Sequence, residues 1–272
     1  MPPYLVGLQG DIMTGRALVT GAGRRLGRAM ALYLARRGYD VAVHYAASAG
    51  EAQAVVAEIA AMGRQAVALQ ADLLAEPQTT GLIARAAAGL GGPLTVLVNN
   101  ASIFEYDRLD TATRSSWDRH MESNLRAPFV LMQGFAAQIA KGAVDVAGEP
   151  VATGLVVNMI DQRVRKLTPE FMSYTLAKMG LWALTQTAAQ ALAPDIRVNA
   201  IGPGPTLQGS RQTAAHFAGQ RAATVLKRGA NASDVTAALG YFLDADAVTG
   251  QLLCVDGGQH LGWKTPDVLG VE

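Results

Sequence analysis

The chain has 272 residues, half of them apolar, and its 23 basic and 22 acidic side chains leave a formal net charge of +1. Such a chain lacks the positive field that releases phosphate counterions, which excludes charge-driven nucleic-acid binding. The single cysteine, Cys254, excludes an internal disulfide and a multi-cysteine zinc site, so we expect no metal and a reducing, cytoplasmic location. No apolar run is long enough for a membrane-spanning helix, and no membrane contact is expected.

Short apolar or β-branched runs alternate along the chain with longer amphipathic stretches. Residues 1–15 lack the basic start and long apolar stretch of a signal peptide and are interpreted as a lead-in segment. The predicted strands are residues 17–20, 41–44, 66–70, 95–98, 155–159, 197–201 and 252–255. The predicted helices are residues 26–37, 50–62, 77–89, 114–140, 169–193 and 233–243.

This alternation predicts an α/β fold: a Rossmann-type, doubly wound sheet of seven parallel strands with helices on both faces. Strands that are apolar at nearly every position fit a sheet covered on both sides. Because no linker or repeat divides the chain, we expect a single domain over residues 1–272. Residues 202–228 are too long for an ordinary connection and are expected to form a substrate loop at the strand ends.

A glycine-rich turn, residues 20–27 (TGAGRRLG), joins the first predicted strand to the first predicted helix. Glycines let the backbone approach a pyrophosphate closely, and the helix N-terminus supplies free N–H groups and positive potential. The turn therefore predicts a dinucleotide site, with a plain strand-to-helix connection as the alternative.

The identity of the dinucleotide depends on the end of the second predicted strand, where an acidic residue would bind the ribose hydroxyls of NAD. Residues 44–48 read HYAAS and contain no acid. Arg24 and Arg25 instead place cations in the glycine turn, where guanidinium groups suit a 2′-phosphate. NADP(H) is therefore the predicted cofactor, although one of the two arginines can equally be an ordinary surface charge.

Tyr174 and Lys178 lie on one face of a predicted helix, at positions i and i+4. A free tyrosine titrates at about 10, and a neighbouring lysine cation favours its phenolate. The pair is therefore a candidate proton donor or acceptor near neutral pH, although the same spacing also occurs by chance on amphipathic helices.

Taken together, these features resemble the short-chain dehydrogenase/reductase family over roughly residues 16–258. The matching motifs, in chain order, are the glycine turn, Asp72, Asn99-Asn100-Ala101, Asn124, Tyr174 with Lys178, and Pro203-Gly204.

Two positions depart from the usual family pattern. Arg25 replaces the middle glycine of the turn, and Asp161 replaces the serine that lies 13 residues before the tyrosine. A serine hydroxyl can donate to a carbonyl, whereas an ionised aspartate only accepts. Both departures, together with residues 100–104 (NASIF), resemble the pteridine reductase branch.

This resemblance implies an NADPH-dependent reductase that transfers hydride to the C=N bond of a dihydropterin, dihydromonapterin or dihydrofolate-like substrate, and a homotetramer. The catalytic residues that it implies are Tyr174, Lys178, Asp161 and Asn124. The implied cofactor-binding residues are Gly21, Arg24, Arg25, Leu26, Gly27, His44, Tyr45, Ala46, Ser48, Asp72, Leu73, Asn100, Ala101, Ser102, Tyr174, Lys178, Pro203, Gly204 and Thr206. The implied substrate-binding residues are Arg25, Ser102, Phe104, Asp161 and Tyr174, with Phe104 stacking on the pterin ring.

Two other functions stay open on the sequence. One is a generic reductase of ketones or 3-oxoacyl thioesters, and the other is a cofactor-sensing protein without catalysis. The intact Tyr174 and Lys178 argue against a pure sensor. Ala46 and Ala47 stand where the pteridine reductases tend to carry basic or polar side chains, which weakens the preference for NADP(H) without reversing it.

Overall fold

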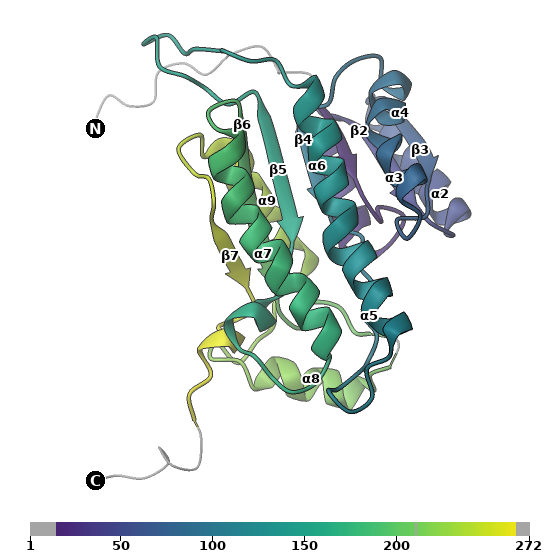
Figure 1. Ribbon diagram of the computed structural model, residues 1–272, viewed down its shortest axis with the longest axis vertical. Coiled ribbons are helices and arrows are strands. Elements are labelled where there is room, and N and C mark those ends of the chain that lie inside the picture. The colour runs from purple at the N-terminus through teal and green to yellow at the C-terminus, as the bar shows by residue number, and fades with distance from the viewer. Residues whose placement is uncertain (1–14, 210, 265–272) are drawn as a thin grey trace.

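The computed structural model describes residues 15–209 and 211–264, so the lead-in segment predicted at residues 1–15 lies almost wholly outside the described residues. The strands are β1 (Arg16–Val19), β2 (Asp40–Tyr45), β3 (Ala66–Gln70), β4 (Val96–Asn99), β5 (Gly154–Met159), β6 (Ile196–Pro203) and β7 (Leu252–Val255). They form one sheet in the order β3-β2-β1-β4-β5-β6-β7, and every neighbouring pair is parallel. The predicted doubly wound sheet is therefore confirmed (Figure 1).

Helices cover both faces of this sheet. The α-helices are α1 (Arg25–Arg36), α2 (Ala49–Ala61), α3 (Glu76–Thr80), α4 (Leu82–Gly89), α5 (Arg114–Met121), α6 (Ala127–Gln138), α7 (Met172–Leu192), α8 (Ala214–Ala222) and α9 (Ala232–Asp244). Shorter helical segments are η1 (Glu122–Arg126), η2 (Gln162–Arg165) and η3 (Gln259–Leu261). No helix among the described residues is both long and apolar enough to cross a bilayer.

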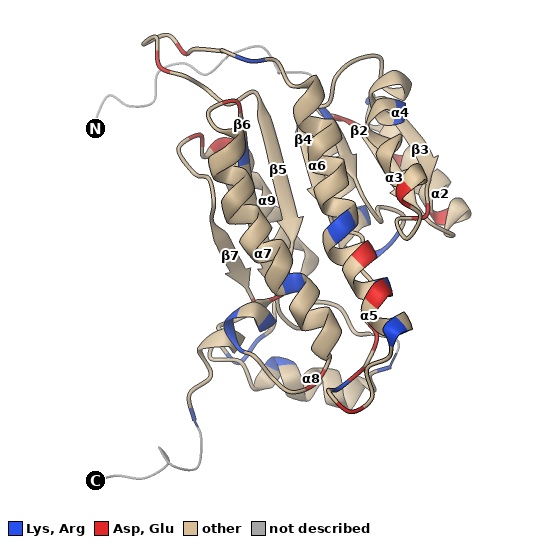
Figure 2. Cartoon of the chain, in the orientation of Figure 1, with Lys and Arg blue, Asp and Glu red and all other residues tan. Residues whose placement is uncertain are grey.

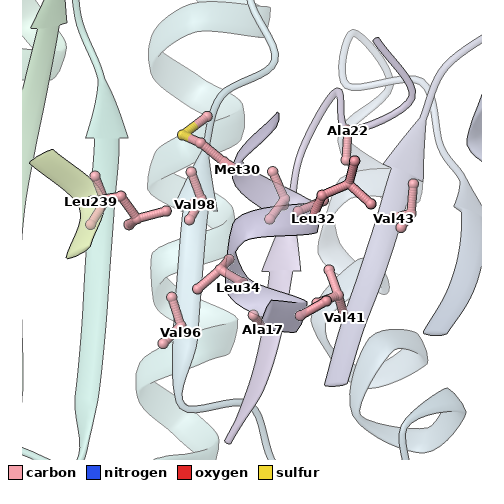
Figure 3. Close-up of a cluster of buried hydrophobic side chains, with 14 of the residues drawn as sticks. Ala17, Ala22, Met30, Leu32, Leu34, Val41, Val43, Val96, Val98 and Leu239 are labelled. Carbon is pink, nitrogen blue, oxygen red and sulfur yellow. The ribbon is translucent and has the colours of Figure 1, made fainter. Parts of the chain in front are cut away.

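Two apolar cores lie on opposite faces of the sheet. α1, α2 and α9 pack on one face, where Ala17, Val96 and Val98 belong to the same core as Met30 and Leu239 (Figure 3). α4, α6 and α7 pack on the other face with the alternate strand residues, such as Leu18 and Leu97. Because successive strand side chains point to opposite faces, both sets must be apolar, which explains the unbroken apolar runs in the sequence.

The structure corrects three of the predicted elements. The helix predicted over 114–140 contains a π-helical turn, η1, between α5 and α6, and the helix predicted over 77–89 is divided at Gly81 into α3 and α4. The loop predicted over 202–228 contains α8, none of whose residues is buried. A helix without a buried face leaves no apolar period in the sequence, so this helix could not be found from periodicity.

Buried amides attach α7 to the centre of the sheet. In the register of β4 and β5, Asn99 lies beside Asn158, and its Nδ2 donates to Asn158 Oδ1 at 2.8 Å. Asn158 Nδ2 in turn donates to Thr185 Oγ1 of α7 at 2.9 Å. Because these two donors are withdrawn from water, each needs its acceptor, and the two hydrogen bonds fix α7 on the central strands.

The close contact between α1 and the glycine turn yields a stability prediction. A Cβ atom added to Gly27 would lie 2.2 Å from the Gly21 carbonyl oxygen and 2.5 Å from Asn100 Nδ2. Because backbone cannot move aside cheaply, we expect Gly27→Ala to lower the free energy of unfolding by about 2 kcal/mol or more and to abolish NADPH binding. Thermal unfolding and a fluorescence titration with NADPH measure the two effects.

Gly219→Ala is the matched control, because a Cβ atom there meets nothing within 4 Å. Alanine favours a helix over glycine by up to about 1 kcal/mol, so this variant should be as stable as the wild type or more stable. Wild-type stability and NADPH binding in Gly27→Ala would contradict the described packing.

Candidate active site

Tyr174, Asp161 and Lys178 converge where β5 ends and α7 begins. The Tyr174 hydroxyl donates to Asp161 Oδ2 at 3.0 Å. Lys178 Nζ donates to the Met159 carbonyl at 2.8 Å and lies 5.7 Å from the centroid of the Tyr174 ring. The tyrosine and the lysine are only 5% and 2% exposed, respectively. The structure therefore brings together the three side chains that the sequence predicted as a proton-transfer set.

Burial controls the protonation of these groups. Loss of hydration, together with the adjacent Asp161 charge, raises the pKa of Tyr174 well above its ordinary value, so the phenol stays protonated. Loss of hydration also raises the pKa of Asp161 and outweighs the hydrogen bond from the Arg163 N–H, which lowers it. Loss of hydration lowers the pKa of Lys178 to about 8. The expectation that Lys178 draws Tyr174 toward its phenolate is therefore wrong for the protein alone. The Tyr174 hydroxyl faces a carboxylate, and the ammonium group is held by a carbonyl.

Asn124 lies in the π-helical turn η1 and is fully buried. Its Nδ2 donates to the Ile103 carbonyl and its Oδ1 accepts from the Ile103 N–H, both at 2.8 Å. Both polar groups of the amide are thus used by the loop that carries Ser102 and Phe104. In the protein alone, Asn124 positions this loop.

The glycine turn is held by a buried histidine. Gly21 has a φ of 63°, and its N–H donates to His44 Nδ1 at 3.0 Å. His44 Nε2 lies 3.1 Å from the Ala71 carbonyl, and burial lowers the pKa of His44 to about 4. The neutral ring therefore accepts at Nδ1 and donates at Nε2, which ties the turn to the end of β3. His44 therefore holds the glycine turn of the predicted cofactor site from the interior of the protein.

The turns after β1 and β4 are joined into one surface. Thr20 Oγ1 accepts from the N–H groups of Asn100 and Ala101, at 2.8 and 2.9 Å. Asn100 Nδ2 donates to the carbonyls of Thr20 and Gly21, at 2.8 and 3.2 Å. These two strands flank the point where the strand order reverses, which is where open α/β sheets bind dinucleotides.

The residues at this point fit a phosphate-bearing cofactor. A Cβ atom added to Gly23 would lie 3.0 Å from Ser48 Oγ, so the serine hydroxyl lies against the glycine turn. Arg24 is exposed beside it and forms an ion pair with Glu51 of α2. α1 begins at Arg25 without a side-chain cap, which leaves its first N–H groups available for an anion.

Arg25 adopts a backbone conformation that normally favours glycine, with a φ of 54°. Its guanidinium donates to the carbonyls of Leu207 and Gln208, at 2.9 and 2.8 Å. In the protein alone, Arg25 thus connects the glycine turn to the start of the predicted substrate loop. Strained conformations of this kind are concentrated at functional sites, which supports a binding role for Arg25.

An aromatic wall borders Tyr174. The ring of Phe104 stacks on Phe171 with 4.3 Å between centroids and meets the edge of Tyr174 at 4.6 Å. The guanidinium carbon of Arg211 lies 5.3 Å from the Phe104 centroid, and that of Arg163 lies 5.1 Å from the Phe171 centroid. Phe104 is 42% exposed, so part of the ring that was predicted to stack on the pterin is accessible.

Phe171 and Arg211 were missed in the sequence. Phe171 has a left-handed φ of 56° just before α7. A phenylalanine rarely adopts this conformation, so its residue type gives no sign of it in the sequence. Arg211 reaches Phe104 from the distant substrate loop, donating to its carbonyl at 2.7 Å. Basic residues also gather around η2, beside the end of β7 (Figure 2).

The remaining predicted cofactor residues lie along the same edge of the sheet. Asp72 is exposed and accepts from the Leu74 N–H at 3.0 Å, and Thr206 is 7% exposed and donates to the Gly204 carbonyl at 3.0 Å. Tyr45 and Pro203 are the last residues of β2 and β6. Leu26 lies in the first turn of α1, and the others lie in the segments after β2, β3 and β4: Ala46, Leu73 and Ser102.

Comparison with known proteins yields a consistent set of matches. The sequence model of the family described as short chain dehydrogenase matches residues 16–218. The solved structure of FolM alternative dihydrofolate reductase 1 from Brucella canis, complexed with NADP, superposes with a TM-score of 0.87 at 41% identity, covering 94% of this chain and 98% of that one. A short chain dehydrogenase from Burkholderia cenocepacia, in complex with NADP, gives a TM-score of 0.80 at 34% identity, covering 90% and 97%. A 3-oxoacyl-[acyl-carrier-protein] reductase FabG from Staphylococcus aureus is 32% identical over 254 residues, which is 92% of this chain and 99% of that protein.

The buried lysine yields a pH prediction. Because burial lowers the pKa of Lys178 to about 8, its ammonium group is present below that pH and is lost above it. We expect kcat/KM for NADPH to fall as the pH rises through about 8. In Lys178→Arg the guanidinium stays protonated, so any remaining activity should keep its value to higher pH. An alkaline limb at the same pH in both proteins would assign the titration to another group.

Proposed function

The chain belongs to the short chain dehydrogenase family and is an NADP(H)-dependent oxidoreductase, and we propose that it reduces a C=N bond of a dihydropterin-type substrate. The observation that carries this proposal is the Tyr174–Asp161 hydrogen bond, 3.0 Å long, at the position where the family pattern has a serine. An ionised carboxylate cannot donate to the oxygen of a carbonyl substrate. It can accept from, and orient, a phenol that protonates a nitrogen.

The proposed chemistry is a paired delivery of hydride and proton. NADPH supplies the hydride to the ring carbon when it is bound. Tyr174, which burial keeps protonated, donates its proton to the adjacent nitrogen. Asp161 holds the phenol and, because its own pKa is raised, can carry the replacement proton from solvent.

The other site residues have supporting roles in this proposal. Lys178 holds the nicotinamide ribose, Ser48 and Arg24 bind the 2′-phosphate, and the glycine turn receives the pyrophosphate. Phe104 offers an aromatic face to a flat heterocycle, with Phe171 stacked behind it at 4.3 Å. The printed name of the Brucella neighbour, an alternative dihydrofolate reductase, supports the same substrate class.

A generic carbonyl reductase is the second candidate function. The FabG relatives, at 32% identity, favour it, because their printed activity is the reduction of a 3-oxoacyl thioester. Asp161 weighs against it, since an oxyanion that develops beside a carboxylate is destabilised by like charge.

We further propose one domain over residues 1–272 and a cytoplasmic location. A single sheet runs through the described residues, and both apolar cores lie on it. The only cysteine, Cys254, is free, which suits a reducing compartment.

A substrate panel tests the proposed function. Wild-type enzyme should oxidise NADPH with a dihydropterin, dihydromonapterin or dihydrofolate and not with small ketones or a 3-oxoacyl thioester. Asp161→Ser should lose at least about a hundredfold in kcat for the pterins, because the phenol loses its carboxylate partner. Turnover of carbonyl compounds alone by the wild type would select the second candidate function.

Tyr174→Phe should lower kcat by about a thousandfold, to a measurable residual rate, while NADPH still binds. The matched control is Tyr106→Phe, which removes the hydroxyl of a half-exposed tyrosine on the same aromatic wall, 5.1 Å from the Phe171 centroid. The control should keep wild-type kcat. Full turnover in Tyr174→Phe would refute the proposed chemistry.

We also propose a homotetramer, in which α6 and α7 contact a second copy of the chain. An apolar groove between these helices is lined by Phe129, Met132, Ala136, Leu184 and Ala188. Light scattering should give four times the chain mass of 28.4 kDa. Ala188→Glu should lower that mass, whereas Ala218→Glu on the exposed helix α8 should not. A monomeric wild type would contradict the proposal.

A further inference from the structure

A buried polar chain lies on the flank of Tyr174 and takes no part in the chemistry described above. It consists of Asp107, Ser173 and His120, which are 2%, 0% and 0% exposed. Asp107 comes from the loop after β4, Ser173 precedes the tyrosine on α7, and His120 lies on α5. The His120 ring is 6.0 Å from the Tyr174 ring, centroid to centroid.

The hydrogen bonds in this chain have a fixed direction. The Glu105 N–H donates to His120 Nε2 at 3.1 Å, so this nitrogen is the acceptor. Burial lowers the pKa of His120, so the ring is neutral and its proton lies on Nδ1. Nδ1 is 2.7 Å from Ser173 Oγ and donates to it. Ser173 Oγ then donates to the carboxylate of Asp107.

Asp107 also supplies the N-terminal cap that α7 lacks in its own sequence. The residue at the cap position is Phe171, in a left-handed conformation and with no capping side chain. Instead, the Ser173 N–H donates to Asp107 Oδ1 at 3.1 Å, and the Met172 N–H donates to the Asp107 carbonyl at 3.3 Å. Two of the free N–H groups in the first turn, and the positive end of the helix dipole, therefore meet one acidic residue of another loop.

We propose that Asp107 is a positioning residue for the reaction, which acts through Ser173 and His120 to set the place of the Tyr174 hydroxyl. Phe171 directly precedes α7 and Tyr174 lies in its first turn, so the contacts of Asp107 with this helix start fix the aromatic wall and the phenol together. The proposal rests on the proposed role of Tyr174 as the proton donor. It assigns a function to three buried residues that no motif in the sequence singled out.

Asp107→Asn keeps the shape of the side chain and replaces one acceptor oxygen by a donor nitrogen, so it changes only the direction of the hydrogen bonds. If the amide oxygen still accepts from the Ser173 N–H, the amide nitrogen lies against Ser173 Oγ and donates to it. The serine proton must then turn toward His120 Nδ1, which forces the ring proton to Nε2, against the Glu105 N–H. The variant therefore fits the space and loses at least one buried hydrogen bond, whichever way the amide lies.

Ser116→Ala is the matched control for this variant. Ser116 Oγ also donates to the carboxylate of Asp107, at 3.2 Å, but it comes from the exposed start of α5 and has no bond to α7. The variant removes a partner of Asp107 and the acceptor of the Thr113 N–H in the capping box of α5, and it leaves the hydrogen bonds among Asp107, Ser173 and His120 in place.

We expect Asp107→Asn to lower kcat at least about tenfold, since small misplacements of a reacting group cost this much or more. KM for NADPH should stay within about twofold, because the cofactor residues are untouched. The solvent deuterium isotope effect on kcat should rise, because delivery of the proton becomes the slow step. Ser116→Ala should match the wild type in all three quantities.

Ser173→Ala keeps the test decisive if Asp107→Asn folds poorly. It removes the hydroxyl and leaves the backbone cap, so it should also lower kcat and raise the isotope effect, and Ser173→Thr should restore both. Rates are expressed per NADPH-binding site, so a loss of folded enzyme alone leaves them unchanged.

Wild-type kcat and isotope effect in Asp107→Asn or Ser173→Ala would overturn the inference. The measurements use whichever substrate the wild type turns over, with Tyr174→Phe in parallel. If Tyr174→Phe is slowed as expected and Asp107→Asn is normal, only the inference fails. If Tyr174→Phe is fully active, the proposed function fails as well.

Discussion

The hydrogen bond between the Tyr174 phenol and the Asp161 carboxylate is the interaction on which the rest of the site depends. In a site with little water, an ionised phenol and an ionised carboxylate cannot stand side by side, so the pair retains a proton. That proton is what a C=N reduction requires on nitrogen. Its transfer is coupled in this proposal to delivery of a replacement proton from solvent through Asp161, so that the two anions do not coexist. The surrounding contacts place the two partners: Lys178 is held on the end of β5, and Asp107 holds the first turn of α7.

The parallel sheet makes this placement possible. Its strand ends bring together segments that are distant in sequence. Thr20 and His44 accept hydrogen bonds there and Asn100 donates them, which fixes the turns after β1 and β4 to one another and the glycine turn to His44. Many polar residues at this edge therefore serve the site by satisfying backbone groups. A cofactor surface built in this way is rigid before any ligand arrives, which reduces the entropy that binding must cost.

The sequence was sufficient for the sheet and for selecting three side chains, Asp161, Tyr174 and Lys178, that the structure brings together. Unbroken apolar runs report burial on both faces of the sheet. Asp161, Tyr174 and Lys178 lie within one short stretch of sequence, at one strand end and in the helix that follows it. It was not sufficient for Phe171, whose left-handed conformation depends on contacts from the loop after β4. Nor could it show that Lys178 is bonded to Met159, or that the phenol pKa rises, because both follow from burial by distant segments.

A double-mutant cycle measures directly whether Tyr174 and Asp161 deliver the proton as one unit. It compares kcat for a dihydropterin among the wild type, Tyr174→Phe, Asp161→Asn and the double variant. If the pair acts as a unit, the double variant is no slower than the slower single variant, which corresponds to a coupling free energy of about 2 kcal/mol or more. Losses that multiply independently, with a coupling energy near zero, would contradict this mechanism.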